Sequence, residues 1–124
     1  MIDDMSLRNL AHLGDSVYEL FVREYTISQT QNIKKLHKLT VSLVNAEFQA
    51  NLLEQIESIL SDEELEIIRR GRNIPVTTSK RINHKLHRVA TALEALLGWL
   101  YLNNRDRLEE VFLYIKNNIP PFNE

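Results

Sequence analysis

Two carboxylates, Asp15 and Glu94, interrupt apolar helical patterns that lie 79 residues apart in the chain. A carboxylate on an apolar helix face is stable as an anion only when a cation or strong hydrogen-bond donors lie beside it. Two such groups brought together could hold Mg²⁺, which prefers oxygen ligands and takes only one or two protein carboxylates. A metal held in this way polarises a phosphoryl oxygen and activates water for phosphodiester hydrolysis. The pattern therefore predicts one metal site shared by two distant segments.

The second segment predicts a helix that is buried on all sides. Between residues 89 and 102, four residues interrupt a run of Ala, Leu, Val and Trp: Thr91, Glu94, Gly98 and Tyr101. Gly98 lies one turn after Glu94 on the same face, where a close approach by another backbone or by a ligand would explain a glycine. The alternative is that Glu94 pairs with an arginine such as Arg88, and that Gly98 merely eases helix packing.

The first segment predicts a helix that Ser6 opens as its N-cap and whose apolar residues form one stripe. Asp15 lies at the edge of this stripe, and Gly14 beside it is a second unfavourable residue for a helix interior. Two such residues in sequence indicate a functional or packing constraint. Glu19 lies one turn further on, where an ordinary ion pair with Arg23 is the alternative to a role at the site.

Length and composition indicate a single domain over residues 1–124, because 124 residues with 44% hydrophobic content suffice for one core. The chain has no cysteine, which excludes a disulfide framework and a thiolate zinc site. No stretch has the features of a signal peptide or of a membrane-spanning helix. We therefore expect a cytoplasmic protein with no membrane partner.

Charge is distributed unevenly along the chain, although the net charge is only -2. The windows 25–46 and 67–93 contain no Asp or Glu, yet they hold ten of the fifteen Lys and Arg residues. These ten are Lys34, Lys35, Lys38, Arg69, Arg70, Arg72, Lys80, Arg81, Lys85 and Arg88. Such segregation is typical of a phosphate-binding face on an otherwise neutral protein. The alternative is a set of solvated basic surfaces with no ligand.

Hydrophobic periodicity predicts an all-α fold of five to seven helices with no strand. The expected spans are 6–25, a short turn or helix near 32–38, 40–59, 62–73, 82–103 and 105–118. Ser61 and Glu64 form a capping box that opens the fourth of these. The clear loop is 73–79, because Pro75 lacks a backbone donor and biases Ile74 away from helix. This loop joins two basic helix ends.

Three strings in this order resemble the catalytic domain of the ribonuclease III family, and more specifically its compact Mini-III branch. They are Leu13-Gly14-Asp15 with Val17-Tyr18-Glu19, then Arg70-Gly71-Arg72-Asn73, then Thr91 to Tyr101 with Glu94-Ala95-Leu96 and Gly98. The resemblance implies a homodimeric endoribonuclease that cleaves double-stranded RNA with Mg²⁺, or with Mn²⁺ in its place, and that has no double-stranded-RNA-binding domain. It also implies maturation of the 23S ribosomal RNA precursor in ribosome biogenesis, with a ribosomal protein that presents the RNA as a further partner.

By this resemblance, Asp15 and Glu94 are the catalytic residues and the metal ligands. Two positions depart from the larger ribonuclease III enzymes: Ala11 stands where those have a glutamate, and Thr91 where they have an aspartate. The Mini-III branch is similar to this chain at both positions, so the departures leave the expected activity intact. Fewer carboxylates do put a second tightly held metal in doubt.

The resemblance also places the loop at 74–81 in the groove of an RNA duplex. A-form RNA is recognised mainly through its phosphates and 2′-hydroxyls. The expected RNA contacts are therefore the basic residues on or beside this loop: Arg70, Arg72, Lys80, Arg81 and Lys85. Supporting roles are expected for Glu19, Asn73, Arg88 and Thr91, although Asn73 could simply cap its helix and Arg88 could orient Glu94. An exposed Trp99 or Phe112 would form the homodimer interface.

Other functions fit the residues less well. The main alternative is a non-catalytic double-stranded-RNA-binding or ribosome-assembly factor on the same fold, which would lose the metal carboxylates. A nucleotide pyrophosphatase would use the acids at 54–57 and 63–64, but these fit a solvated face and a helix amino terminus. The basic cluster at 67–88 argues against a helical protein-interaction module. A histidine-based metal phosphohydrolase is disfavoured because no histidine adjoins an aspartate.

Overall fold

The computed structural model describes residues 4–75 and 84–120, which form six α-helices and one 3₁₀ turn. Helix α1 spans Asp4–Ile27, α2 spans Ile33–Val44 and α3 spans Ala46–Ile56, and the 3₁₀ turn η1 follows at Glu57–Ile59. Helix α4 spans Asp62–Arg72, α5 spans His84–Asn103 and α6 spans Arg105–Asn118. No strand occurs in these two ranges, so the all-α prediction is confirmed.

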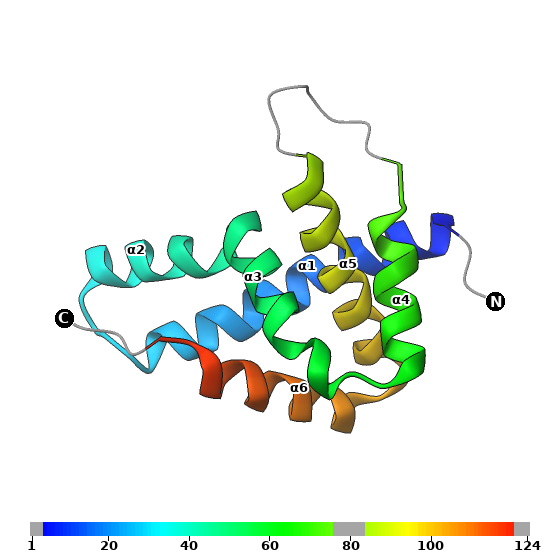
Figure 1. The fold of residues 1–124 in the computed structure, drawn as a ribbon. Coiled ribbons are helices and arrows are strands. Elements are labelled where there is room, and N and C mark those ends of the chain that lie inside the picture. The colour runs from blue at the N-terminus through cyan, green and yellow to red at the C-terminus, as the bar shows by residue number, and fades with distance from the viewer. Residues whose placement is uncertain (1–3, 76–83, 121–124) are drawn as a thin grey trace.

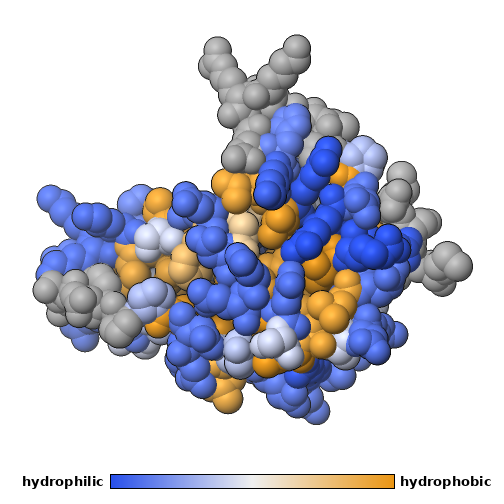
Figure 2. Space-filling view, in the orientation of Figure 1, coloured by the Kyte–Doolittle hydropathy of each residue, from blue (hydrophilic) through white to orange (hydrophobic). Residues whose placement is uncertain are grey.

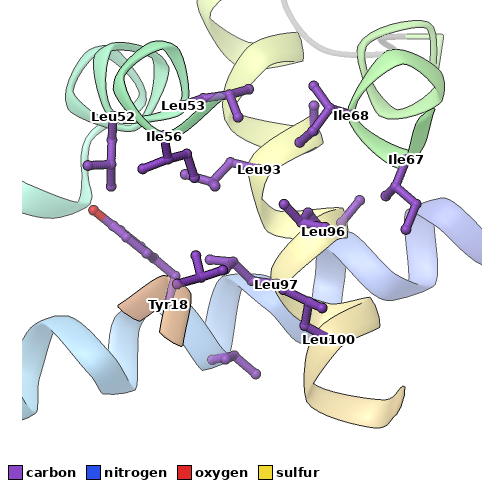
Figure 3. Close-up of a cluster of buried hydrophobic side chains, with 14 of the residues drawn as sticks. Tyr18, Leu52, Leu53, Ile56, Ile67, Ile68, Leu93, Leu96, Leu97 and Leu100 are labelled. Atoms are coloured by element: carbon purple, nitrogen blue, oxygen red, sulfur yellow. The ribbon is translucent and has the colours of Figure 1, made fainter. Parts of the chain in front are cut away.

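Helix α5 is the central element, and α1, α3, α4 and α6 all pack against it (Figure 1). Its buried residues include Leu93, Leu96 and Leu97, each with no exposed surface. Figure 3 shows these leucines between apolar side chains of α3 and α4, with Tyr18 of α1 beside them. Each fully buried leucine of this kind contributes about 1.5–3 kcal/mol to folding. The prediction of a buried helix over 89–102 is therefore confirmed.

Helices α1 and α5 touch backbone to backbone where they cross. A Cβ atom added at Gly14 would lie 1.7 Å from the carbonyl oxygen of Glu94, and one at Gly98 would lie 2.0 Å from that of Leu10. Neither distance is compatible with a side chain, so each helix contributes one glycine to the crossing. The close approach expected at Gly98 is confirmed, and the approaching group is another backbone.

Two helix boundaries differ from the expectation. Helix α1 begins at Asp4, so Ser6 lies inside the helix and is not its N-cap. The helix expected at 40–59 is interrupted at Asn45, whose extended backbone ends α2 and whose side chain accepts a hydrogen bond of 2.8 Å from the Phe48 N–H. Asparagine is a strong N-cap former, and this preference outweighs the apolar periodicity that runs through the position. The capping box of Ser61 and Glu64 is confirmed.

A hollow of about 560 Å³ lies between α1 and α6. We call it the α1–α6 groove; Leu20 and Leu113 line it and are 59% and 60% exposed. Phe112 also lines it but is buried, because its ring stacks on Phe21 at a centroid distance of 4.2 Å. The expectation that Phe112 is exposed is thus wrong, and Trp99 is half-buried.

None of the helices in the described part of the chain combines the length and the apolar character needed to cross a membrane.

Candidate active site

The fold brings Asp15 of α1 and Glu94 of α5 to one hollow of about 380 Å³, which we call the carboxylate hollow. Arg8, Ala11 and His12 on α1 and His87, Ala90 and Thr91 on α5 line it as well. These positions recur every three or four residues, so each set occupies one face of its helix. Val44, Ala46 and Gln49 close the hollow from the junction of α2 and α3. The predicted convergence of the two segments is therefore observed.

The two carboxyl groups interact directly, and their interaction changes the chemistry of Glu94. Burial first, and then the hydrogen bond and charge of Asp15, raise the pKa of Glu94 to about 8. Hydrogen bonding by Gln49 acts in the opposite direction and favours the ionised form. Two adjacent carboxylates repel each other when both are ionised, and a divalent cation beside them removes that penalty. The pair thus has the electrostatic character of a cation site.

The two carboxyl groups are oxygen ligands of the kind that Mg²⁺ takes. Among the described residues, no group of three or more His, Cys, Asp or Glu side chains lies close enough to hold a metal ion. Two carboxylates with water are nevertheless a usual Mg²⁺ environment. Ala11 offers no ligand atom, and the Thr91 hydroxyl donates to the His87 carbonyl oxygen at 2.8 Å. Among the described residues that line the hollow, the carboxylate ligands are Asp15 and Glu94.

Gln49 lines the carboxylate hollow and is an addition to the residues predicted for the site. It is 4% exposed, and its side-chain N–H donates to the Val44 carbonyl oxygen at 3.1 Å. A signal was present in the sequence, because Gln49 precedes Leu52, Leu53 and Ile56 at helical spacing and so stands on the buried stripe of α3. A polar residue on such a stripe needs a partner, and here the Val44 carbonyl oxygen supplies one.

Three of the expected supporting residues have local structural partners. Glu19 accepts a hydrogen bond of 2.8 Å from Arg23, which is the i,i+4 ion pair considered as the alternative. Asn73 is the C-cap of α4, and its side-chain N–H donates to the Arg69 carbonyl oxygen at 3.0 Å. Thr91 lines the hollow but its hydroxyl is bonded to its own helix.

Arg88, the fourth supporting residue, is exposed and forms no ion pair with Glu94, although the structure describes both residues. Six residues along an α-helix separate two side chains by about 120°, which turns Arg88 away from the hollow. The pairing of Glu94 with Arg88 is therefore not observed. The arginine that does line the hollow is Arg8, whose Nη2 donates to the Pro75 carbonyl oxygen at 3.3 Å.

The expected RNA contacts are only partly described. Lys80 and Arg81 lie outside the described residues. Arg70 at the end of α4 is half-buried, and Lys85 at the start of α5 is exposed. Arg72 forms an ion pair of 2.8 Å with Glu57 of η1, so its charge is already partnered. The surface over α2, which carries the basic residues of the first acid-free window, is mostly hydrophilic (Figure 2).

A model of the ribonuclease III domain matches residues 8–105, which include both carboxylates and most of the six helices. The chain therefore belongs to the ribonuclease III family. A Mini-ribonuclease 3 from Clostridium tetani is 41% identical over 112 residues, which cover 87% of this chain and 74% of that protein. A second Mini-ribonuclease 3, from Enterococcus faecalis, is 34% identical over 93% of this chain and 91% of its own length.

The fold is also similar to a crystal structure of a Fusobacterium nucleatum protein. The TM-score is 0.77 at 31% identity, over 91% of this chain and 93% of the other. The resemblance to the compact Mini-III branch and the enzyme class expected from it, an endoribonuclease, are thereby confirmed.

Proposed function

We propose that the chain is a Mg²⁺-dependent endoribonuclease that cleaves double-stranded RNA in the cytoplasm. The observation that carries the proposal is the meeting of Asp15 and Glu94 in one hollow of a ribonuclease III domain. A non-catalytic RNA-binding protein would have no need for two adjacent carboxyl groups, because their mutual repulsion is unfavourable in the absence of a cation.

Asp15 and Glu94 would hold the metal, and bound Mg²⁺ supplies a polarised phosphoryl oxygen and an activated water. The chain itself contributes position and charge. Burial and Asp15 keep a proton on Glu94 up to a pKa of about 8, so a cation must displace that proton to recruit both carboxylates. Gln49 favours the ionised form of Glu94 and so assists the exchange.

Binding of the RNA is proposed to rest on phosphate contacts around the connection between α4 and α5. Arg70 and Lys85 flank this connection, and Lys80 and Arg81 belong to it. The acid-free windows 25–46 and 67–93 leave few groups that would repel a polyanion there. Arg72 contributes less to this contact, because Glu57 already partners it.

The proposed substrate is a stem of the 23S ribosomal RNA precursor, with a ribosomal protein that presents it. The proposed assembly is a homodimer that associates through the α1–α6 groove. Leu20 and Leu113 leave apolar surface exposed there, and a second copy that covers it would bury that surface symmetrically. A dimer with two carboxylate hollows would cut both strands of a duplex.

The test compares the wild type with Asp15→Asn and Glu54→Gln on a duplex from a ribosomal RNA stem, with Mg²⁺, Mn²⁺ or EDTA. Glu54 is an exposed carboxylate of α3 and serves as the matched control. We expect staggered cuts by the wild type and the control with either metal, and no cuts by Asp15→Asn or in EDTA. Binding of the duplex without cleavage in every condition would instead support the non-catalytic RNA-binding factor.

A further inference from the structure

The side chain of Gln49 joins two parts of the molecule. Its Nε2 donates a hydrogen bond of 3.1 Å to the carbonyl oxygen of Val44, the last residue of α2. The same side chain lines the carboxylate hollow together with Glu94 of α5, and its amide lies near enough to that carboxyl group to lower its pKa. An amide nitrogen carries two N–H groups, so one can serve the backbone and the other the carboxylate. Gln49 thus connects the junction of α2 and α3 to the carboxylate hollow.

The remaining atom of this amide has no partner. Oε1 of Gln49 is the one buried side-chain nitrogen or oxygen in the described residues that lacks a hydrogen bond. A buried acceptor without a donor destabilises the folded state. The other residues of this stripe, Leu52, Leu53 and Ile56, fill their space without such a penalty. Packing alone would therefore favour a leucine or methionine at position 49. What a glutamine offers that these residues lack is an amide with two N–H donors.

We infer that Gln49 is a positioning residue, whose amide, anchored on Val44, holds the Glu94 carboxylate in the orientation that binds the metal beside Asp15. This inference rests on the proposed function. Glu94 has a flexible side chain, and without an N–H donor its carboxyl group would bond to Asp15 alone. Partners that orient a metal ligand in this way change metal affinity or activity by about 10–100-fold when they are removed.

The test replaces the amide by an apolar side chain of similar size, in Gln49→Met, and repeats the change in Gln49→Leu. Gln55→Met is the matched control, because Gln55 is an exposed glutamine of the same helix. Three quantities are measured: thermal stability in EDTA, Mn²⁺ affinity without RNA by calorimetry, and kcat and KM for duplex cleavage. Calorimetry provides a readout that does not depend on activity.

We expect both variants at position 49 to stay folded with a small change in stability, because the unpaired oxygen is removed but the Val44 carbonyl oxygen loses its donor. Mn²⁺ affinity and kcat should each fall by about 10–100-fold, with little change in the KM for RNA, and Gln55→Met should match the wild type. Wild-type Mn²⁺ affinity and kcat in the Gln49 variants would overturn the inference. Failure of both variants to fold would also overturn it, since the amide would then be structural.

The two proposals can fail separately. If the wild type cleaves and the Gln49 variants cleave equally well, the inference is wrong and the proposed function stands. If the wild type does not cleave the duplex, the proposed function fails, and the Mn²⁺ affinities still decide whether Gln49 positions a metal ligand.

Discussion

Arg107 of α6 binds Glu64 of α4 through both carboxylate oxygens, with Nε and Nη2 each donating at 2.9 Å. Glu64 is 4% exposed and also accepts the Ser61 N–H in the capping box of α4. Nη2 of Arg107 donates in addition to the Ile59 carbonyl oxygen at 2.6 Å. The Glu64 carboxylate therefore caps α4 and also binds α6 through Arg107. The capping pattern in the sequence predicts only the cap.

Replacement of this arginine, in Arg107→Met, should lower the free energy of unfolding by about 3–5 kcal/mol, because it leaves a buried carboxylate unpaired. Arg69→Met removes an exposed pair with Glu66 and should cost much less, because water and salt screen that pair. Urea unfolding at neutral pH measures both. The hydrogen bonds from Arg107 lower the pKa of Glu64, so this stabilisation is present above the ordinary pKa and is lost as the pH falls through the lowered one. Equal losses in the two variants would contradict this account.

The metal-free protein should lose stability as the pH rises from about 4.5 to about 8. Folded Glu94 has a pKa of about 8, against an ordinary value of 4.5, so the folded chain keeps a proton that the unfolded chain releases. The expected slope is roughly 1 kcal/mol per pH unit, and Glu94→Gln should remove it. Urea unfolding in EDTA across this range measures the slope. Arg8, His12 and His87 also face the hollow, so the difference between wild type and variant, rather than either curve alone, is decisive.

Gly14→Ala should destabilise the protein by about 3 kcal/mol or more, and Gly98→Ala should do the same. A methyl group at either position meets a backbone carbonyl of the opposite helix, and a backbone cannot move aside as a flexible side chain can. Asn9→Ala, at an exposed position of α1, is the control and should change stability by less than about 0.5 kcal/mol. Thermal unfolding measures all three. Wild-type stability in Gly14→Ala would show that the two helices can separate at little cost.

Neutralisation of Arg70 and Lys85, each to Gln, should weaken binding of duplex RNA and reduce the slope of log affinity against log salt by about one for each variant. The reason is that each charge lost from a phosphate contact leaves one counterion unreleased. Arg23→Gln on α1 removes a charge that already pairs with Glu19, and it should leave the slope unchanged. Binding in EDTA at several salt concentrations provides the measurement. Equal slopes in all three variants would remove these two residues from the RNA interface.

Leu20→Glu should convert the proposed homodimer into a monomer, because it places a charge in the apolar α1–α6 groove. Leu65→Glu introduces the same charge at another exposed leucine, on α4, and should leave the mass unchanged. Light scattering coupled to size-exclusion chromatography reports the mass of each variant. A monomeric wild type would refute the dimer and leave the enzyme class unaffected.

The helices and the two carboxylates could be predicted because their signals are local. Apolar periodicity locates α4, α5 and α6 within two residues of their observed ends, and the glycine after Glu94 indicates the close helix crossing. Asn45 was missed because apolar residues on both sides continue one helical pattern, and only the N-cap hydrogen bond to Phe48 breaks it.

Contacts across the sequence could not be predicted in the same way. Whether Gln49 lies in one hollow with Glu94, or Arg107 bonds to Glu64, depends on which helix faces meet, and periodicity along one helix does not determine that. The expected pairing of Arg88 with Glu94 fails for the opposite reason. The two residues are close in sequence, but their positions around α5 direct their side chains to different sides of the helix.

The crossing of α1 and α5 at Gly14 and Gly98 leaves no room for change in the backbone around the two carboxylates, whereas exposed side chains elsewhere can vary. With the two main chains in contact at Gly14 and Gly98, the Cα atoms of Asp15 and Glu94 are fixed relative to each other by atoms that no substitution on the surface can reach. In the proposed enzyme, the geometry of the two carboxylates would thus depend on the helix crossing, and RNA contacts on the basic residues around the connection between α4 and α5. The proposed RNA contacts around the connection between α4 and α5 could then be varied in a search for a new cleavage preference, while Gly14 and Gly98 stay unchanged.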